Sequence, residues 1–162
     1  MATPLFAVRI QEAPFDAAAE SARLSAGRTD VGAVVTFTGL CRADPDAGGA
    51  SLAALTLEHY PGMAEAEIER HVEEARRRWP LTGAIVVHRH GRLVPGDPIV
   101  MVATAASHRA AAFAAAEFLM DWLKTDAPFW KKEERADGGA WVEAKAHDDD
   151  ARARWEKTGE SR

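Results

Sequence analysis

Segments with a strand pattern and segments with a helix pattern follow one another irregularly along this chain of 162 residues. The β-branched run 33–38 (AVVTFT) predicts a buried strand, because such residues pack well on a pleated surface. Between Gly62 and Pro80, apolar residues recur at helical spacing on one face and charged residues cover the other, which predicts an amphipathic helix. No strict strand–helix–strand repeat connects the segments. We therefore expect an α+β fold rather than a doubly wound parallel sheet.

The remaining elements follow from the same patterns and from turn residues. Strands are expected at 5–10, 55–59, 84–88 and 99–105, helices at 16–26 and 107–124, and a hairpin from 129–135 and 141–144. Asp16 and Ser107 are expected to cap the two helices. Residues 42–51, with Asp-Pro-Asp and Gly-Gly, are expected to form a loop. The length fits one domain, residues 1–146, followed by a charged C-terminal tail at 147–162.

The composition is ordinary for a globular chain and limits the classes of partner. Lysine and arginine total 20 and aspartate and glutamate 25, so the net charge of −5 disfavours general nucleic-acid binding. The single cysteine, Cys41, excludes an intrachain disulfide and a multi-cysteine zinc site, and it indicates a reducing compartment. The apolar run 5–8 is too short for a signal-peptide core, and no stretch reaches the ~20 apolar residues that span a bilayer. We expect a soluble, cytoplasmic protein.

The tripeptide Ser107-His108-Arg109 begins a predicted helix and is a candidate anion site. Free N–H groups and the positive end of the helix dipole favour an anion there. His108 and Arg109 are cations at the helix end that disfavours cations, as expected where binding matters more than stability. A phosphate or carboxylate would resolve this conflict by accepting two hydrogen bonds from Arg109. The alternative is a solvated helix start that tolerates two surface cations.

Three lysines flank the aromatic segment that follows the same helix: Lys124, Lys131 and Lys132. Aromatic neighbours and a nearby second ammonium both lower the pKa of a lysine amine. A lysine of this kind can act as base or nucleophile, and a charged lysine can stabilise an anionic transition state. The alternative is that the lysines interact with the helix dipole and that Phe129 and Trp130 are core residues.

Arg109 and Lys124 are 15 residues apart on one predicted helix. A rise of ~1.5 Å per residue places them about 22 Å apart, so one small ligand cannot easily contact both within one chain. Either they serve different ligands, or two copies pair so that the helix start of one meets the helix end of the other. A symmetric dimer would produce such reciprocal contacts.

Other candidate residues carry less specific signals. Arg42 follows a strand, where loop arginines often bind ligands, although a surface arginine is the simpler interpretation. His88 and His90 have the spacing of two metal ligands on one strand face, but no third ligand is evident and no metal site is expected. His71 is expected to be a partly buried structural histidine. Cys41 has no base beside it in the sequence and is not expected to be catalytic.

Several short segments carry a family resemblance when they are taken together. They are GAVVTFTG (32–39) with Arg42, LEHYPGM (57–63), RWP (78–80), HRHG (88–91), PGD (95–97) and WVEA (141–144). The most specific part is SHR (107–109) followed by LKTDAPFWKKE (123–133). In this order, over about residues 6–145, they resemble the large, catalytic subunit of molybdopterin synthase.

The resemblance implies an α+β fold of α/β-hammerhead type with an additional small antiparallel sheet or hairpin. It also implies a homodimer of this chain that binds a small ubiquitin-like sulfur-carrier subunit at each end, giving a heterotetramer. The carrier's C-terminal Gly-Gly tail, as a thiocarboxylate, would enter a pocket and transfer sulfur to cyclic pyranopterin monophosphate. Two transfers would form the dithiolene of molybdopterin, and this subunit would need no metal and no cofactor.

The resemblance also assigns roles to residues of this chain. Lys124 and Lys131 are the implied catalytic lysines, with Lys124 facing the thiocarboxylate and Lys131 assisting proton transfer or stabilising developing charge. The implied substrate-binding residues are Arg42, His108 and Arg109 at the pterin phosphate, across the dimer interface, and Lys132 and Glu133 in the same pocket.

The chain departs from the family pattern between Gly39 and Arg42. The family usually has a lysine and an aliphatic residue there, whereas this chain has Leu40 and Cys41. One positive charge is therefore missing near the predicted phosphate site, where Leu40 and Cys41 would contribute backbone contacts.

Two other functions stay open on the residues themselves. One is a lysine Schiff-base enzyme acting on a phosphorylated carbonyl compound, which Lys124 near Lys131 would suit and which borohydride trapping would detect. The other is a non-catalytic dimer that binds an anion and a ubiquitin-like partner. In that protein, Lys124→Ala would leave the activity of a reconstituted system intact.

Overall fold

The computed structural model describes residues 3–45, 49–136, 138–142, 153, 155 and 156. In chain order, its elements are β1 (Leu5–Gln11), α1 (Ala17–Ala22), β2 (Ala33–Leu40), β3 (Ala54–His59), α2 (Met63–Arg78), β4 (Leu81–Arg89), β5 (Gly91–Leu93), β6 (Pro98–Ala106), α3 (Arg109–Thr125), β7 (Phe129–Arg135) and β8 (Gly138–Val142). Two four-stranded sheets form, with strand orders β1-β4-β6-β2 and β5-β3-β7-β8. This arrangement confirms the predicted α+β class and its additional small antiparallel sheet.

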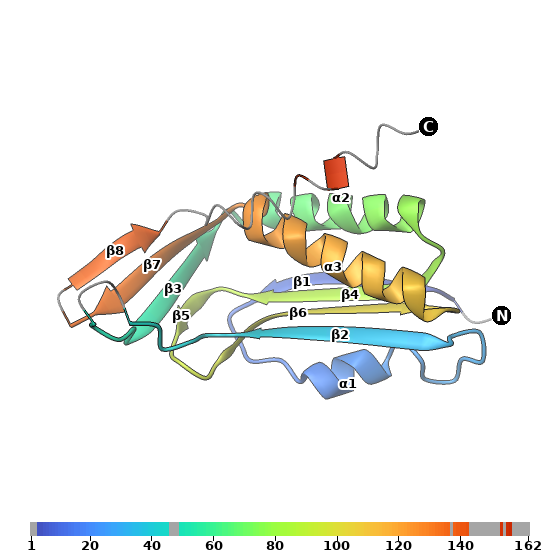
Figure 1. Ribbon diagram of the computed structural model, residues 1–162, viewed down its shortest axis with the longest axis horizontal. Coiled ribbons are helices and arrows are strands. Elements are labelled where there is room, and N and C mark those ends of the chain that lie inside the picture. The colour runs from blue at the N-terminus through green and yellow to red at the C-terminus, as the bar shows by residue number, and fades with distance from the viewer. Residues whose placement is uncertain (1–2, 46–48, 137, 143–152, 154, 157–162) are drawn as a thin grey trace.

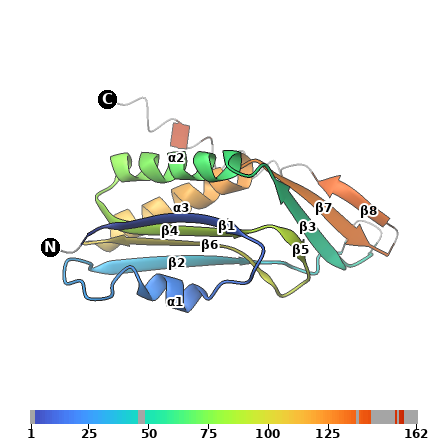
Figure 2. The same cartoon turned by 180° about the vertical axis from the view of Figure 1, so that it is seen from behind.

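The larger sheet is covered on both faces. Helices α2 and α3 pack side by side over one face, and α1 lies over the other (Figures 1 and 2). Strand β4 pairs in parallel with β1 and antiparallel with β6, so it is central. Its side chains alternate: Ala84 and Val86 join the core beneath α2 and α3, while Ile85 and Val87 join the core beneath α1. Burial on both faces explains why the strand is a continuous apolar run.

The core beneath the two long helices is centred on Phe118 of α3, which is fully buried. Its ring meets the Trp79 ring edge to face, with centroids 5.4 Å apart. Trp155, beyond the predicted domain boundary at residue 146, lies against the same ring at 5.6 Å and donates a hydrogen bond from Nε1 to Asp121 Oδ2 at 2.6 Å. At least this residue of the charged C-terminal segment therefore packs on α3. The rest of the predicted tail, except Ala153 and Glu156, lies outside the described residues.

The small sheet extends from one end of the larger sheet (Figure 1). Strand β3 pairs antiparallel with β5 and β7, and β7 forms the predicted hairpin with β8, although residues 143 and 144 of the expected hairpin lie outside the described residues. Phe129, the first residue of β7, stacks on the His88 ring near the end of β4, with centroids 3.9 Å apart. This stack joins the start of β7 to the end of the larger sheet.

Strand β2 corrects one prediction, because it is not buried. It is the outermost strand of the described larger sheet, and Val34, Phe37 and Leu40 are 38%, 41% and 57% exposed. The β-branched run correctly predicted a strand, but strand propensity does not report how many neighbours the strand has. The strand also continues past Gly39 to Leu40, with a register shift between the two residues.

The two helix caps had different outcomes. The predicted cap at Asp16 is confirmed, since its Oδ1 accepts a hydrogen bond from the Ala19 amide at 3.0 Å. This helix ends at Ala22, four residues earlier than predicted. The cap predicted at Ser107 is wrong: His108 is the N-cap of α3, without a side-chain hydrogen bond. The Ser107 hydroxyl instead donates to the Asp30 carbonyl oxygen at 3.0 Å. This hydrogen bond connects the loop between α1 and β2 to the end of β6.

In the part of the chain that the structure describes, no helix is both long enough and apolar enough to span a membrane.

Candidate active site

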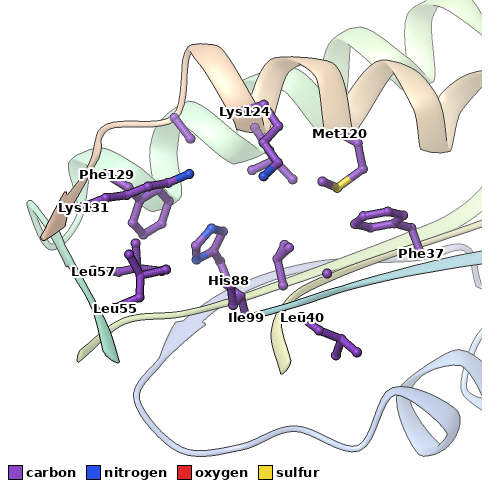
Figure 3. A pocket seen from close by; sticks show the side chains of 14 residues that line it. Phe37, Leu40, Leu55, Leu57, His88, Ile99, Met120, Lys124, Phe129 and Lys131 are labelled. Carbon is purple, nitrogen blue, oxygen red and sulfur yellow. The ribbon is translucent and has the colours of Figure 1, made fainter. Parts of the chain in front are cut away.

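A pocket of about 110 Å³ lies where the end of α3, the small sheet and the end of the larger sheet meet (Figure 3). Most of the side chains that line it are apolar, and the lining also includes two lysines and one histidine. The lining residues are Phe37, Gly39, Leu40, Leu55, Leu57, His88, Ile99, Val100, Met120, Leu123, Lys124, Ala127, Phe129 and Lys131. An apolar cavity with few convergent polar groups is the usual form of a small-molecule site.

Lys124 and Lys131 enter this pocket from different elements. Lys124 is in the last turn of α3, where the helix dipole favours a cation. Pro128 lies between the end of α3 and the start of β7, so the chain changes direction within a few residues. Alternation along β7 then directs Phe129 and Lys131 to the pocket. Figure 3 shows both lysine side chains pointing into the same space. The predicted pair of lysines is thus brought together.

His88 is the site residue whose role the sequence did not reveal. Its Nδ1 is 2.8 Å from the Arg89 carbonyl oxygen, an arrangement in which Nδ1 donates and Nε2 is left as an acceptor. Burial, reinforced by the charges of Lys131 and Lys124, lowers the pKa of His88 to about 4, although the bond to the carbonyl acts in the opposite direction. The ring is therefore neutral at neutral pH and adds no third positive charge to the pocket.

The signal for His88 was its position rather than its spacing from His90. A histidine near the end of a strand that is otherwise buried and apolar must find a partner for its ring nitrogens. The His90 ring instead contacts His59, with centroids 4.7 Å apart, and does not line the pocket. Among the described residues, neither His88 nor His90 belongs to a cluster of three potential metal ligands.

The residues expected at the pterin phosphate do not line the pocket of a single described chain. His108 and Arg109 are exposed at the opposite end of α3, and the helix length places Arg109 about 22 Å from Lys124. Arg42 is also exposed, and its Nε lies 2.7 Å from Asp44 Oδ1 in an ion pair. The helix-length argument therefore holds: a ligand at Lys124 cannot reach Arg109 of the same chain.

The other residues expected at the pocket differ in their placement. Lys132 is exposed and, by strand alternation, faces away from the pocket. Glu133 forms an ion pair with Arg135, with 2.8 Å between Glu133 Oε2 and Arg135 Nη2. Neither residue lines the pocket of a single described chain, and their role at the substrate stays a prediction. Leu40 does line it. Cys41 is buried, its amide donates to the Asp97 carbonyl oxygen at 2.8 Å, and burial raises the pKa of its thiol.

Comparisons with known proteins find relatives over almost the whole chain. The model of a family described as "MoaE protein" matches residues 10–126. A molybdopterin synthase catalytic subunit from Mesorhizobium japonicum is 61% identical over 155 residues, which cover 94% of this chain and 95% of that protein. One from Rhizobium meliloti is 60% identical over 157 residues, covering 96% and 98%. The solved molybdopterin biosynthesis MoaE protein from Burkholderia ambifaria superposes with a TM-score of 0.78 at 51% identity, covering 96% of this chain and 99% of that one.

Proposed function

The chain belongs to the MoaE protein family, and we propose that it works as the catalytic subunit of a molybdopterin synthase, the name its relatives carry. The proposed reaction is sulfur transfer from the thiocarboxylated C-terminus of a small ubiquitin-like carrier to cyclic pyranopterin monophosphate, which forms the dithiolene of molybdopterin. The observation that carries this proposal is the convergence of Lys124 and Lys131 in one largely apolar pocket.

The chemistry requires cations because both reactants are anionic. A phosphate and a thiocarboxylate repel each other, and two unit charges ~4 Å apart interact by about 4 kcal/mol at an effective dielectric constant of about 20. A cation beside each anion offsets a repulsion of this size. Lys124 faces the incoming thiocarboxylate, whose sulfur bonds to a carbon of the substrate. Water then adds to the carrier's carbonyl carbon and the carbon–sulfur bond of the carrier breaks, which leaves the carrier with a C-terminal carboxylate. Lys131 stabilises the charge that develops in this step, or transfers a proton.

The partner delivers the sulfur, so this chain's contribution is positioning and charge. The apolar walls of the pocket lower the local dielectric constant, so each ammonium acts more strongly than it would in bulk solvent. The neutral His88 ring stacks on Phe129, two residues before Lys131, and so holds the start of β7 in place. Because His88 is neutral, it offers an acceptor without repelling the two lysines.

The substrate site is complete only when two copies of the chain pair. Arg109 lies too far from Lys124 of its own chain, so the phosphate-binding residues must come from a second copy. The exposed apolar residues Phe37 and Leu40 support such pairing, because they lie beside the pocket on β2, the outermost strand of the larger sheet in the part of the chain that the structure describes. A homodimer with one carrier at each end gives the proposed heterotetramer.

The compartment we propose is the cytoplasm. The single cysteine, Cys41, is a buried free thiol, which suits a reducing environment.

A reconstitution tests the proposed reaction. The protein is mixed with thiocarboxylated carrier and cyclic pyranopterin monophosphate, and the dithiolene product is detected by mass spectrometry. Wild type and Arg77→Ala, a charge-removing control on the exposed face of α2, should form product, whereas Lys124→Ala should form little. Absence of product from a folded protein that binds the carrier would refute the proposal. A lysine adduct trapped by borohydride would favour the Schiff-base alternative.

Mixing two inactive variants tests whether the site is shared between copies. In a mixed dimer of Lys124→Ala and Arg109→Ala, one pocket keeps its own lysine and receives an intact arginine from the partner. Random pairing should therefore restore about one quarter of the wild-type activity, since half of the dimers are mixed and each has one intact pocket. If Arg109 served the pocket of its own chain, each mixed dimer would contain two defective pockets and the mixture would stay inactive.

A further inference from the structure

Outside the pocket, three potential metal ligands lie together where α2 meets the C-terminal end of α3. They are Glu67, His71 and Asp126, and their ligand atoms all lie within 4.8 Å of one another. His71 Nε2 is 3.4 Å from Asp126 Oδ2 and 3.9 Å from Glu67 Oε2. Glu67 and His71 are four residues apart on α2, so they occupy the same face of the helix.

His71 provides the observation that distinguishes this cluster from ordinary surface carboxylates. The residue is only 7% exposed, and its ring stacks on Trp122 with centroids 4.8 Å apart. Its Nε2 has no hydrogen-bond partner among the residues that the structure describes, although both carboxylates are near. A buried polar atom without a hydrogen-bond partner is unfavourable, so buried ring nitrogens normally have a partner. A cation between Nε2 and the carboxylates would supply one.

The position of Asp126 gives a second, electrostatic argument. Asp126 is the C-cap of α3, and its amide donates to the Trp122 carbonyl oxygen at 2.7 Å. A carboxylate at this end of a helix faces the negative end of the helix dipole, which is unfavourable. A bound cation would reverse the sign of this interaction. The side chains of Glu67 and Asp126 are 33% and 31% exposed, so an ion can enter from solvent.

We propose that Glu67, His71 and Asp126 bind a divalent cation of the zinc type, with water completing the coordination. One imidazole nitrogen and two carboxylate oxygens form a ligand set that Zn²⁺ accepts. With metal–ligand distances of about 2.0–2.1 Å, tetrahedral ligand atoms lie about 3.3 Å apart, close to the separation between His71 and Asp126. Only the Glu67 carboxylate, 3.9 Å from His71 Nε2, must move closer to reach this separation. Its Oε2 accepts a hydrogen bond from the exposed Arg70 at 2.6 Å, but an exposed pair of this kind is weak.

This cation would act on the pocket by fixing the position of Lys124. Asp126 follows Lys124 by two residues, so a metal that links Asp126 to α2 fixes the end of the helix from which Lys124 extends. The three ligands do not line the pocket, and the metal would not contact the reactants. The site therefore does not depend on the proposed sulfur transfer.

Metal titration tests the site directly. Tag-free protein is freed of metal with a chelator and titrated with Zn²⁺ in a calorimeter, and Co²⁺ serves as an absorption probe of the ligand field. We expect one equivalent to bind wild type and the control Glu69→Gln, which removes an exposed charge from the same helix. The near-isosteric variants Glu67→Gln and Asp126→Asn should weaken binding by at least about tenfold. Both replace partly exposed side chains, and circular dichroism verifies that each variant is folded.

A nitrogen NMR spectrum provides the second measurement, because coordination should move the His71 Nε2 resonance on addition of Zn²⁺. No stoichiometric binding by wild type would overturn the proposal. Unchanged affinity in both carboxylate variants, or an Nε2 resonance that does not respond while zinc binds, would also overturn it by placing the ion elsewhere.

Discussion

Acidification should destabilise the folded chain through His88. The pKa of this buried ring is lowered from 6.5 to about 4, mainly by burial. As the pH falls below 6.5, the unfolded chain takes up a proton at this position and the folded chain does not, so stability is lost between 6.5 and about 4 and is fully present above this window. The difference, 6.5 − 4 = 2.5, corresponds to a total loss of about 3.4 kcal/mol. About 2 kcal/mol of this should already be lost at about pH 5.

Urea unfolding of wild type and His88→Gln at about pH 7.5 and about pH 5 measures this contribution. The substitution also changes stability at each pH, so the quantity to compare is the change in unfolding free energy between the two pH values. Contributions from groups that titrate in both proteins cancel in this comparison. Wild type should lose about 2 kcal/mol more than the variant. Equal pH dependence in the two proteins, or an NMR titration midpoint of His88 near its ordinary value, would refute the reasoning that the ring is buried and neutral beside the lysines.

Three further outcomes follow from the structure. Lys131→Ala should lower kcat for product formation by about 10²–10³-fold with the fold intact, and a loss below about tenfold in steady-state assays would contradict its role. Leu40→Lys, which places an ammonium group at the pocket, should lower the KM for the pterin substrate, and raising the salt concentration should remove the gain. Phe118→Ala should cost about 3–5 kcal/mol in urea unfolding, because the ring is fully buried among three tryptophans, and a loss below about 1 kcal/mol would show that the core collapses around the gap.

The sequence predicted most of the secondary structure because each element carries a local signal. The period of the α2 segment and the carboxylate at Asp16 act within a few residues, and the structure confirms both. The exposure of β2 could not be predicted in the same way. Its apolar residues suit a buried strand, and only the order of the strands, set by long-range pairing with β6, leaves them on an edge.

The candidate site was predicted to a similar extent and for similar reasons. The separation of Arg109 from Lys124 depends only on helix geometry, so it could be derived from the sequence. The approach of Lys124 to Lys131 depends on the short turn at Pro128, which proline chemistry suggests without fixing its direction. The position of His88 near the end of an apolar strand indicates a buried ring, but its place at the pocket depends on packing between two sheets, which no local pattern reports.

The length of α3 makes this chain more sensitive to insertions and deletions in the helix than to substitutions on its surface. Each residue of an α-helix advances the chain by ~1.5 Å and turns it by about 100°. Deleting one alanine between Arg109 and Lys124 would leave composition and helix propensity almost unchanged, yet it would turn one end of α3 relative to the other by more than a quarter of a circle. Lys124 would then point away from the pocket, or Arg109 away from the second copy. Substitutions on the exposed face of α3 can therefore accumulate, whereas a single insertion or deletion between Arg109 and Lys124 should abolish activity.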